Sequence, residues 1–463
     1  SWQEREIFSG TDIVIRTDGQ RHLGAALGTE AFCNEYVQLK VDGWCTEVCN
    51  LAAIAMTQPQ AAYVVFTNVL RHRWSFLART MPGVHEYFHP LERTIATKLI
   101  PALTGRSPLG AEERSILAMP CRHGGLGIVS RPSLTTEFGA SVKITEALVM
   151  KIRRQDMSLE GVPEQTRIAK PAVREAHRQQ EEQHRKDVFN SVSPDLQRCM
   201  ELAAEKGASN WLTCRPLARF GFALSKAEFR YALCLRYGWQ PNNLPTKCVC
   251  GQQFTVTHAL SCPNGGFPSI RHNEISDVFA ECLVKVAHAV EIEPHLEPLS
   301  GEHLQPRTAV RDDQARLDVV ANGVYGGRFE RSFLDVRVFN PYARSNSSSS
   351  IASVYRKHEQ EKRRLYEPSV REVEHASFIP VVYATSGGAG RSANALVKRI
   401  ASLMAEKMLQ PYSQVMAWLR SKISISLVRA SILCLRGSRR PRARIQLNPD
   451  NIGLEVVEGR LSS

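Results

Sequence analysis

Residues 315–321 read Ala-Arg-Leu-Asp-Val-Val-Ala, and residues 329–339 read Phe-Glu-Arg-Ser-Phe-Leu-Asp-Val-Arg-Val-Phe. Both stretches are rich in β-branched and aromatic residues, and a glycine-containing segment separates them, so they predict two neighbouring β-strands. Side chains alternate between the two faces of a strand. Each predicted strand therefore carries one carboxylate, Asp318 or Asp335, among apolar neighbours.

The segments around these strands alternate between helix and strand. The pattern predicts helices over residues 271–290, 353–375 and 391–409, and a buried strand over residues 378–384. Such alternation is typical of an α/β domain. We expect this domain to cover residues 266–410 and to have a mixed central sheet.

Two carboxylates in an apolar sheet are costly unless they are paired or hold a cation. A hard divalent ion, Mg²⁺ or Mn²⁺, prefers such oxygen ligands. It would polarise a phosphodiester and supply hydroxide at neutral pH. The alternative is that the aspartates form ion pairs with the neighbouring Arg316 and Arg337, and the strands alone favour this alternative.

The helix predicted after the second strand is rich in charge. Tyr355, Glu359, Lys362 and Tyr366 fall at steps of four, three and four, so they line one face. A lysine there would orient the attacking water or stabilise charge on the phosphate. Further cations, on this helix and on the two strands, offer phosphate contacts that position a nucleic acid strand: Arg316, Arg337, Arg356, Lys357, Arg363 and Arg364. The alternative is a solvated helix of mixed charge.

A cluster of cysteines and histidine precedes the α/β segment. Cys248, Cys250, His258 and Cys262 are the ligand types of tetrahedral Zn²⁺, although the first spacing is tight. Zinc would stabilise the fold of this short stretch, which has few core residues, and so would be structural rather than catalytic. The alternative is a loop with reduced cysteines and a surface histidine.

Length and composition set the context. The chain has 463 residues, so several units are expected, and its 43% hydrophobic content is that of a globular protein. The net charge of +13 favours a polyanionic partner, and nucleic acid more than a membrane. The chain begins at Ser1 without a secretion leader, which predicts a piece of a longer polypeptide. The longest apolar stretch, residues 51–66, is interrupted by polar residues and predicts no membrane span.

The chain divides into segments of different character. Residues 1–140 are expected to be mostly helical, because apolar residues recur at three- and four-residue steps: Tyr63, Phe66, Leu70, Trp74 and Leu77. Residues 141–246 form a helical linker region that is highly charged over 151–190. Residues 247–265 hold the cysteine cluster, and residues 411–463 are assigned to a basic C-terminal tail.

Residues 386–391 read Ser-Gly-Gly-Ala-Gly-Arg between a predicted strand and a predicted helix. This is the context of a phosphate-binding loop. The segment lacks the lysine and the serine or threonine of a nucleotide-binding loop, so a plain strand-to-helix turn is favoured.

The order of these parts resembles the PD-(D/E)XK restriction-like nuclease core, and more closely the endonuclease of site-specific non-LTR retrotransposons. In that subgroup a CCHC knuckle precedes the nuclease, and the catalytic lysine has moved from a strand to the following helix. Arg337 stands at the strand position, and Lys362, four residues before Tyr366, matches the migrated lysine. Leu317 replaces a proline of the pattern, and Lys357 is a rival for the lysine.

This resemblance implies a metal-dependent endonuclease that nicks target DNA to prime reverse transcription, acting in the nucleus. The implied catalytic residues are Asp318, Asp335, Lys362 and Tyr366, with Mg²⁺ or Mn²⁺ on the aspartates and Zn²⁺ in the knuckle.

Residues 19–28 and 120–128 resemble the region C-terminal to the palm in retrotransposon reverse transcriptases. This implies primer-grip and thumb elements that hold element RNA and a primer–template duplex. The aromatic-x-Asp-Asp motif of the palm is absent, and Arg311-Asp312-Asp313 lies in the nuclease region. Polymerisation is therefore not expected from this chain alone.

Two other functions remain open from the sequence. One is a catalytically inactive or domesticated nucleic-acid-binding protein that retains the knuckle and the basic surface. The other is an RNA-binding module made of the thumb and linker. Retention of Asp318, Asp335 and Lys362 together favours the active nuclease.

Overall fold

The computed structural model describes residues 10–11, 16–106, 110–128, 134–241, 244–296 and 316–437. The expected tail beyond residue 437 and the Arg-Asp-Asp stretch at 311–313 lie outside the described residues. The chain divides into two compact units, one made of Ser1–Pro120 and Leu126–Ser191, the other of Cys121–Gly125 and Val192–Ser463.

The first unit is helical apart from one hairpin. Strands β1 (Gly19–His22) and β2 (Ala25–Gly28) pair antiparallel. The following helical segments are α2 (Glu30–Ala55), α3 (Pro59–Val65), η1 (Phe66–Leu70), α4 (Arg71–Thr80), η2 (Val84–Phe88), α5 (His89–Thr94), η3 (Ile95–Leu99), α6 (Ile100–Thr104) and α7 (Ala111–Ala118). All five apolar residues predicted to line one helical face between Tyr63 and Leu77 are buried. They pack with aromatic side chains, since Trp74 meets Trp44 edge-on at 6.1 Å.

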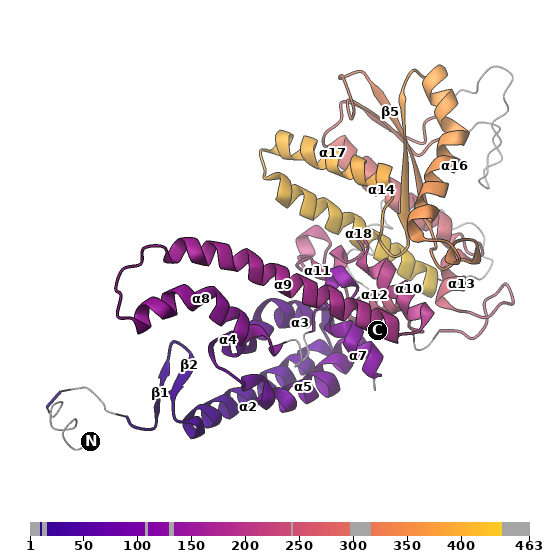
Figure 1. Ribbon diagram of the computed structural model, residues 1–463. Helices are drawn as coiled ribbons and strands as arrows, with labels where there is room; N and C mark the ends of the chain where they lie inside the picture. The colour runs from indigo at the N-terminus through magenta and orange to yellow at the C-terminus, as the bar shows by residue number, and fades with distance from the viewer. Residues whose placement is uncertain are drawn as a thin grey trace. The chain divides into compact units, whose positions relative to one another are not determined.

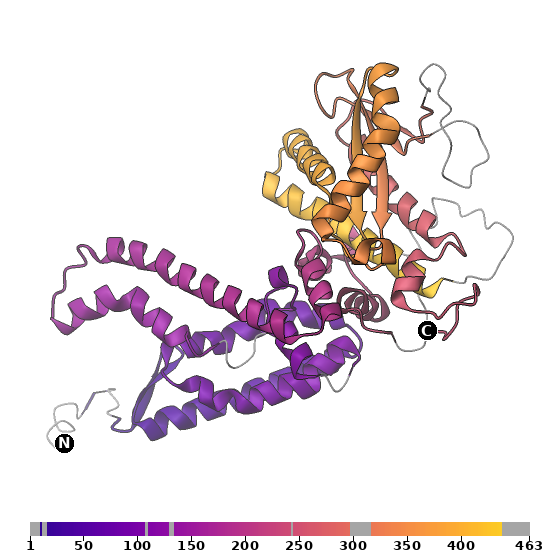
Figure 2. The same cartoon turned by 45° about the vertical axis from the view of Figure 1, so that its right-hand side comes forward.

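A long helical hairpin completes this unit. Helices α8 (Glu137–Arg153) and α9 (Val162–Ser191) lie side by side (Figures 1 and 2). Most of α9 is exposed, and exposed Glu–Arg pairs three residues apart line it, such as Glu175 with Arg178. The charged segment predicted at residues 151–190 is therefore largely a solvated helix.

The second unit contains the cysteine cluster and the sheet. Its helical segments are η4 (Cys121–His123), α10 (Pro194–Ala204), α11 (Asn210–Thr213), η6 (Ala218–Phe220), α12 (Lys226–Tyr237), α13 (Val256–Ser261), α14 (Phe267–Val284), α15 (Arg344–Ser347), α16 (Ile351–Glu372), α17 (Arg391–Met408) and α18 (Tyr412–Arg436). Its strands are β3 (Val290–Ile292), β4 (Val319–Asn322), β5 (Arg331–Phe339) and β6 (Ser377–Ala384). In the described part of the chain they form one sheet in the order β3-β4-β5-β6.

The sheet is mixed, as expected. β3 and β5 each pair antiparallel with β4, whereas β5 and β6 are parallel. Helices cover both faces (Figure 1). On one face, Leu334 and Val336 of β5 pack with α14, α17 and α18, and on the other, Phe333 and Phe339 pack with α16. The alternation predicted for β5 is therefore confirmed.

Residues 412–436, predicted to belong to a basic tail, are helical instead. They form helix α18, most of which is buried. It packs on α14 and α17, so that Leu419, Ile423 and Leu427 join the main core of the sheet. Its cation Arg429 is neutralised by buried Glu228 at 3.1 Å. None of the helices in the described ranges has the length and apolar character needed to cross a bilayer.

Candidate functional site

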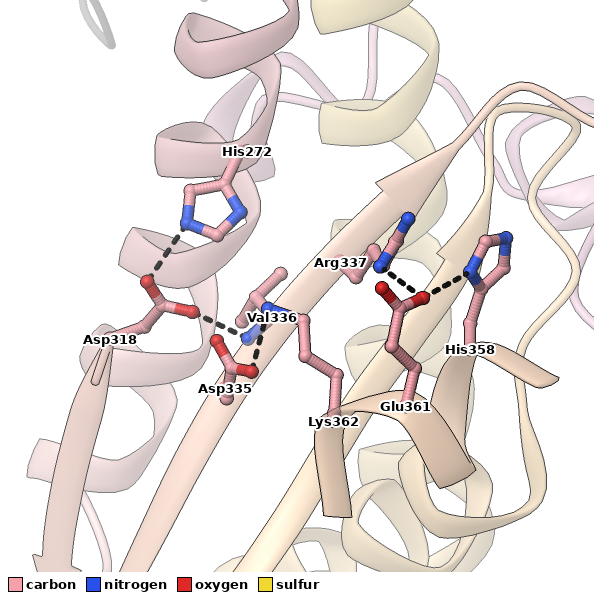
Figure 3. Close-up of polar contacts among 8 residues, drawn as sticks. All are labelled: His272, Asp318, Asp335, Val336, Arg337, His358, Glu361 and Lys362. Carbon is pink, nitrogen blue, oxygen red and sulfur yellow. Dashed lines mark hydrogen bonds and ion pairs between the residues drawn. The ribbon is translucent and has the colours of Figure 1, made fainter. Parts of the chain in front are cut away.

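The register of β4 and β5 brings the two predicted carboxylates together. Val319 faces Leu334 in this antiparallel pair, so the preceding residue, Asp318, comes opposite Asp335. The amide of Asp318 donates to the carbonyl of Leu334 at 3.1 Å, which extends the ladder to this point. Figure 3 shows both carboxylates beside the middle of β5.

Both oxygens of Asp318 are held. His272 of α14 contacts Oδ1 through Nε2 at 2.8 Å, and the amide of Val336 donates to Oδ2 (Figure 3). His272 lies near the beginning of α14, far from Asp318 in the sequence. The carboxylate is thereby fixed between a helix and a strand.

Asp335 has a different partner. The Nζ atom of Lys362 on α16 lies 2.7 Å from Asp335 Oδ2, and both side chains are largely buried. The ring of Tyr366, one turn further along α16, lies 5.6 Å from the same Nζ atom and packs against Phe378. Tyr366 thus lies beneath the lysine, where it supports that side chain.

The electrostatics follow from burial and from these contacts. Burial raises the pKa of Asp335 to about 6, and Asp318 adds to the rise while Lys362 opposes it. Burial acts in the same direction on Asp318, but His272, the amide of Val336 and Lys362 together lower the pKa of Asp318. Burial disfavours the charges on Lys362 and His272, yet Asp335 raises the pKa of Lys362 and Asp318 raises that of His272.

The arginines beside the aspartates have carboxylate partners of their own. Arg316 pairs with Glu293 at 3.6 Å, and Arg337 pairs with Glu361 of α16 at 3.1 Å. His358, which is 5% exposed, lies on the far side of Glu361 (Figure 3). Burial, reinforced by Arg337, lowers the pKa of His358 to about 4. Arg337 thus lies on the same strand face as Asp335 but is directed to Glu361.

The remaining predicted cations lie along α16. Lys357, Arg356 and Arg364 are exposed, whereas Lys362 is the α16 lysine that contacts Asp335. Arg363 is partly buried and pairs with Glu367 at 2.8 Å. The exposed cations face solvent, where they could meet a phosphate backbone.

The glycine-rich segment at residues 386–391 is a strand-to-helix turn, as favoured. The carboxylate of Glu359 accepts the amide of Ser392 at 2.9 Å, at the first turn of α17. A carboxylate already satisfies this helix terminus, so an anionic phosphate there would meet negative charge.

The donor set at Asp318 and Asp335 fits a hard divalent cation. Two carboxylates from adjacent chain segments converge, and the more buried one has its pKa raised by burial and by the other. Carboxylate oxygens are preferred ligands of Mg²⁺, which also keeps several waters. Asp318 and Asp335 would hold such an ion, while Lys362 remains beside Asp335.

The cysteine cluster is compact enough for zinc. The ligand atoms of Cys248, Cys250, His258 and Cys262 all lie within 4.8 Å of one another. Zn–S bonds of about 2.3 Å in a tetrahedron place two sulfurs about 3.8 Å apart. The Sγ atoms of Cys248 and Cys262 are 3.8 Å apart. The four side chains can therefore hold one zinc ion.

Local structure explains why these four residues converge. Gly251, with φ +86°, makes the turn after the first two cysteines. Thr255 then caps α13 by accepting the amide of His258 at 3.1 Å, which directs this short helix and its histidine toward the cluster.

The cluster is bonded to the sheet and to α14. Asn340, directly after β5, donates to the carbonyl of Thr257 at 3.0 Å and to the hydroxyl of Ser261 at 2.8 Å. Buried Arg271 donates to the carbonyl of Leu260 at 3.0 Å and to that of Val338 at 3.4 Å. The knuckle, α14 and β5 are thus joined by hydrogen bonds between side chains and backbone.

The first unit contains a separate basic groove of about 600 Å³ between the hairpin, α2 and α4. Arg21, Lys40 and Arg73 line it, and Arg73 pairs with Glu47 across it. Phe76, 44% exposed, adds an aromatic surface. Cations interleaved with an exposed ring are the features by which proteins bind nucleic acid strands.

Sequence reasoning missed His272 and the knuckle contacts of Arg271 and Asn340. The helix that carries His272 and Arg271 was predicted, but its hydrophobic pattern does not specify which residue faces Asp318. Asn340 could have been flagged, because an asparagine that ends a buried strand favours turns and side-chain-to-backbone hydrogen bonds.

Comparison with known proteins gives no further assignment. No protein-family model matches this chain, and no curated protein is significantly similar to it.

Proposed function

We propose that this chain is a metal-dependent DNA endonuclease, the part of a non-LTR retrotransposon protein that nicks target DNA. The observation that carries the proposal is the convergence of Asp318, Asp335 and Lys362 from three segments of the second unit. Paired carboxylates with an adjacent lysine are suited to hydrolysing a phosphodiester.

Each side chain has a separate role in this proposal. Asp318 and Asp335 hold the divalent cation, which when bound supplies Lewis acidity and an activated water. Lys362, close to Asp335, stabilises negative charge that develops on the phosphate. Tyr366 limits the movement of the lysine by lying beneath its Nζ atom. The exposed cations Arg356 and Arg364 contact flanking phosphates.

The wider context supports nucleic acid as the partner. The chain carries a net charge of +13, and the groove in the first unit combines cations with an exposed ring. In the proposed element, the nick exposes a 3′ hydroxyl from which reverse transcription is primed. The first unit holds element RNA or the primer–template duplex, while the polymerase palm belongs to another part of the parent polypeptide.

The proposal is tested with supercoiled plasmid and the purified, zinc-loaded chain. Mg²⁺ should convert the plasmid to the nicked circle, and a DNA polymerase should extend the nick, which demonstrates a 3′ hydroxyl. Chelation of Mg²⁺ should stop the reaction, and Asp335→Asn should not nick. A chain that binds DNA but leaves the plasmid supercoiled would favour the catalytically inactive nucleic-acid-binding protein instead.

A further inference from the structure

We propose that His272 is a positioning residue of the nuclease site, which fixes the carboxylate of Asp318 for cation binding. This inference rests on the proposed function. The observation that supports it is the 2.8 Å contact between His272 Nε2 and Asp318 Oδ1. His272 itself lies outside the strand–helix motif of Asp318, Asp335 and Lys362.

Two contacts on one carboxylate define its orientation. A carboxylate held at one oxygen can still rotate about its terminal bond, because that torsion is broad. Asp318 is held at Oδ1 by His272 and at Oδ2 by the amide of Val336. Each oxygen retains a further lone pair for a cation. His272 therefore sets the plane of the carboxylate while leaving acceptor capacity toward Asp335.

The helix that carries His272 is itself fixed. Its neighbour Arg271 is 3% exposed and bonds to the carbonyls of Leu260 and Val338. A rotation or shift of α14 would break these bonds together with the contact to Asp318. A fixed helix thus holds the imidazole in position, as pre-organised sites require.

The contact lies where a cation could reach it. The side chains of His272 and Asp318 are 31% and 17% exposed, so the pair is half-buried at the edge of the site. Groups that hydrogen-bond to metal ligands commonly change metal affinity or activity by about 10- to 100-fold when they are removed. A contact that only stabilised the fold would leave cation affinity unchanged.

The test compares His272→Ala, His272→Gln and the control His288→Ala in the full, zinc-loaded chain. Glutamine retains an N–H donor, and His288 is an exposed histidine of the same unit. The experiment measures Mn²⁺ binding in the absence of DNA. The electron paramagnetic resonance signal of the free ion reports how much Mn²⁺ remains unbound. His272→Ala should raise the Mn²⁺ dissociation constant by about 10-fold or more. His272→Gln should recover part of this loss, and His288→Ala should match the wild type.

A second measurement separates this inference from the proposed function. Nicking by His272→Ala should require a correspondingly higher Mg²⁺ concentration and recover as Mg²⁺ is raised, with the melting temperature close to that of the wild type. Unchanged Mn²⁺ affinity and Mg²⁺ requirement in His272→Ala would overturn the role of His272 even if the wild type nicks DNA. Loss of Mn²⁺ affinity in a chain whose wild type never nicks would support the role of His272 and contradict the nuclease.

Discussion

The Nζ atom of Lys362 lies 2.7 Å from Oδ2 of Asp335. Lys362 lies on helix α16 and Asp335 on strand β5, and residues 340–350 connect the two elements. Both side chains are largely buried, and Asp318 lies on the other side of Asp335. A buried carboxylate with one ammonium and one further carboxylate beside it is an arrangement that a divalent cation would stabilise.

We expect Asp318→Asn and Asp335→Asn each to reduce nicking to the level of DNA without protein, because each substitution removes an anionic ligand. DNA affinity should stay close to that of the wild type, since phosphate contacts come from exposed cations. Plasmid relaxation and a gel-shift titration measure the two properties. Continued Mg²⁺-dependent nicking by either variant would remove that residue from the site.

Lys362→Ala should lower the nicking rate by about 100-fold or more, because charge stabilisation near the phosphate is lost. Lys357→Ala is the matched control on the same helix. Lys357 is exposed, so its loss should affect DNA binding modestly and the single-turnover rate little. If Lys357→Ala were the more damaging change, the assignment of the catalytic lysine would be wrong.

Purified protein should contain about one zinc per chain, held by Cys248, Cys250, His258 and Cys262. Cys250→Ser should lower this content and expose residues 245–265 to hydrogen exchange. Cys214→Ser is the control, because Cys214 lies outside the cluster. Elemental analysis that finds no zinc in protein prepared without chelators would contradict the site.

Glu205 should make stability depend on pH. Burial raises its pKa to about 7, although Tyr355 donates a hydrogen bond to it at 3.1 Å. The folded state therefore holds the proton more tightly than the unfolded state, so this contribution to stability is present at low pH and is lost as the pH rises through about 7.

Glu205→Gln mimics the protonated acid. The variant should match the wild type near pH 4 and exceed it near pH 8 by up to about 3 kcal/mol in the free energy of unfolding. Denaturant titration at the two pH values measures this difference. Glu201→Gln, an exposed neighbour, should show no such difference. An equal loss of stability at both pH values would refute the explanation.

The first unit should bind a primer–template duplex without extending it, because the aspartates of a polymerase palm are not in this chain. Affinity should fall steeply with salt, by roughly 0.9 in the log–log slope for each phosphate neutralised. Lys40→Ala in the groove should weaken binding more than Lys98→Ala, an exposed lysine outside it. Nucleotide incorporation, or binding insensitive to salt, would contradict this prediction.

The strands and helices around Asp335 were predictable because their local patterns are strong. Leu334, Val336 and Val338 occupy alternate positions of β5. A hairpin places two successive strands side by side, so the proximity of Asp318 and Asp335 followed from the sequence. The contact of Lys362 with Asp335 was predicted only through the resemblance to a nuclease family, since the face of α16 alone left Lys357 open.

Other features depend on tertiary packing. His272 meets Asp318 because of how α14 is rotated against the sheet, and its local pattern does not encode this rotation. The burial of α18 was not predicted, because this segment contains basic residues. One of them, Arg429, is neutralised by Glu228 of α12, a contact that the local sequence does not reveal. Ser350, the last of four consecutive serines, caps α16 by accepting the amide of Ser353 at 3.4 Å.

The hydrogen bonds of Asn340 and Arg271 limit where the chain can be cut to obtain a fragment that folds by itself. A fragment that began at residue 266 would keep the carboxylates and the lysine but lose the acceptors at Thr257, Ser261 and Leu260. The deletion would also expose Cys434 and Leu435 of α18, which pack with Phe254, Val256 and Leu260 in one buried apolar cluster. The smallest autonomous fragment of this kind should therefore include the cysteine cluster and α18. If the cysteine cluster were replaced by that of another protein, the backbone of α13 would have to match the end of β5, which it contacts through Asn340.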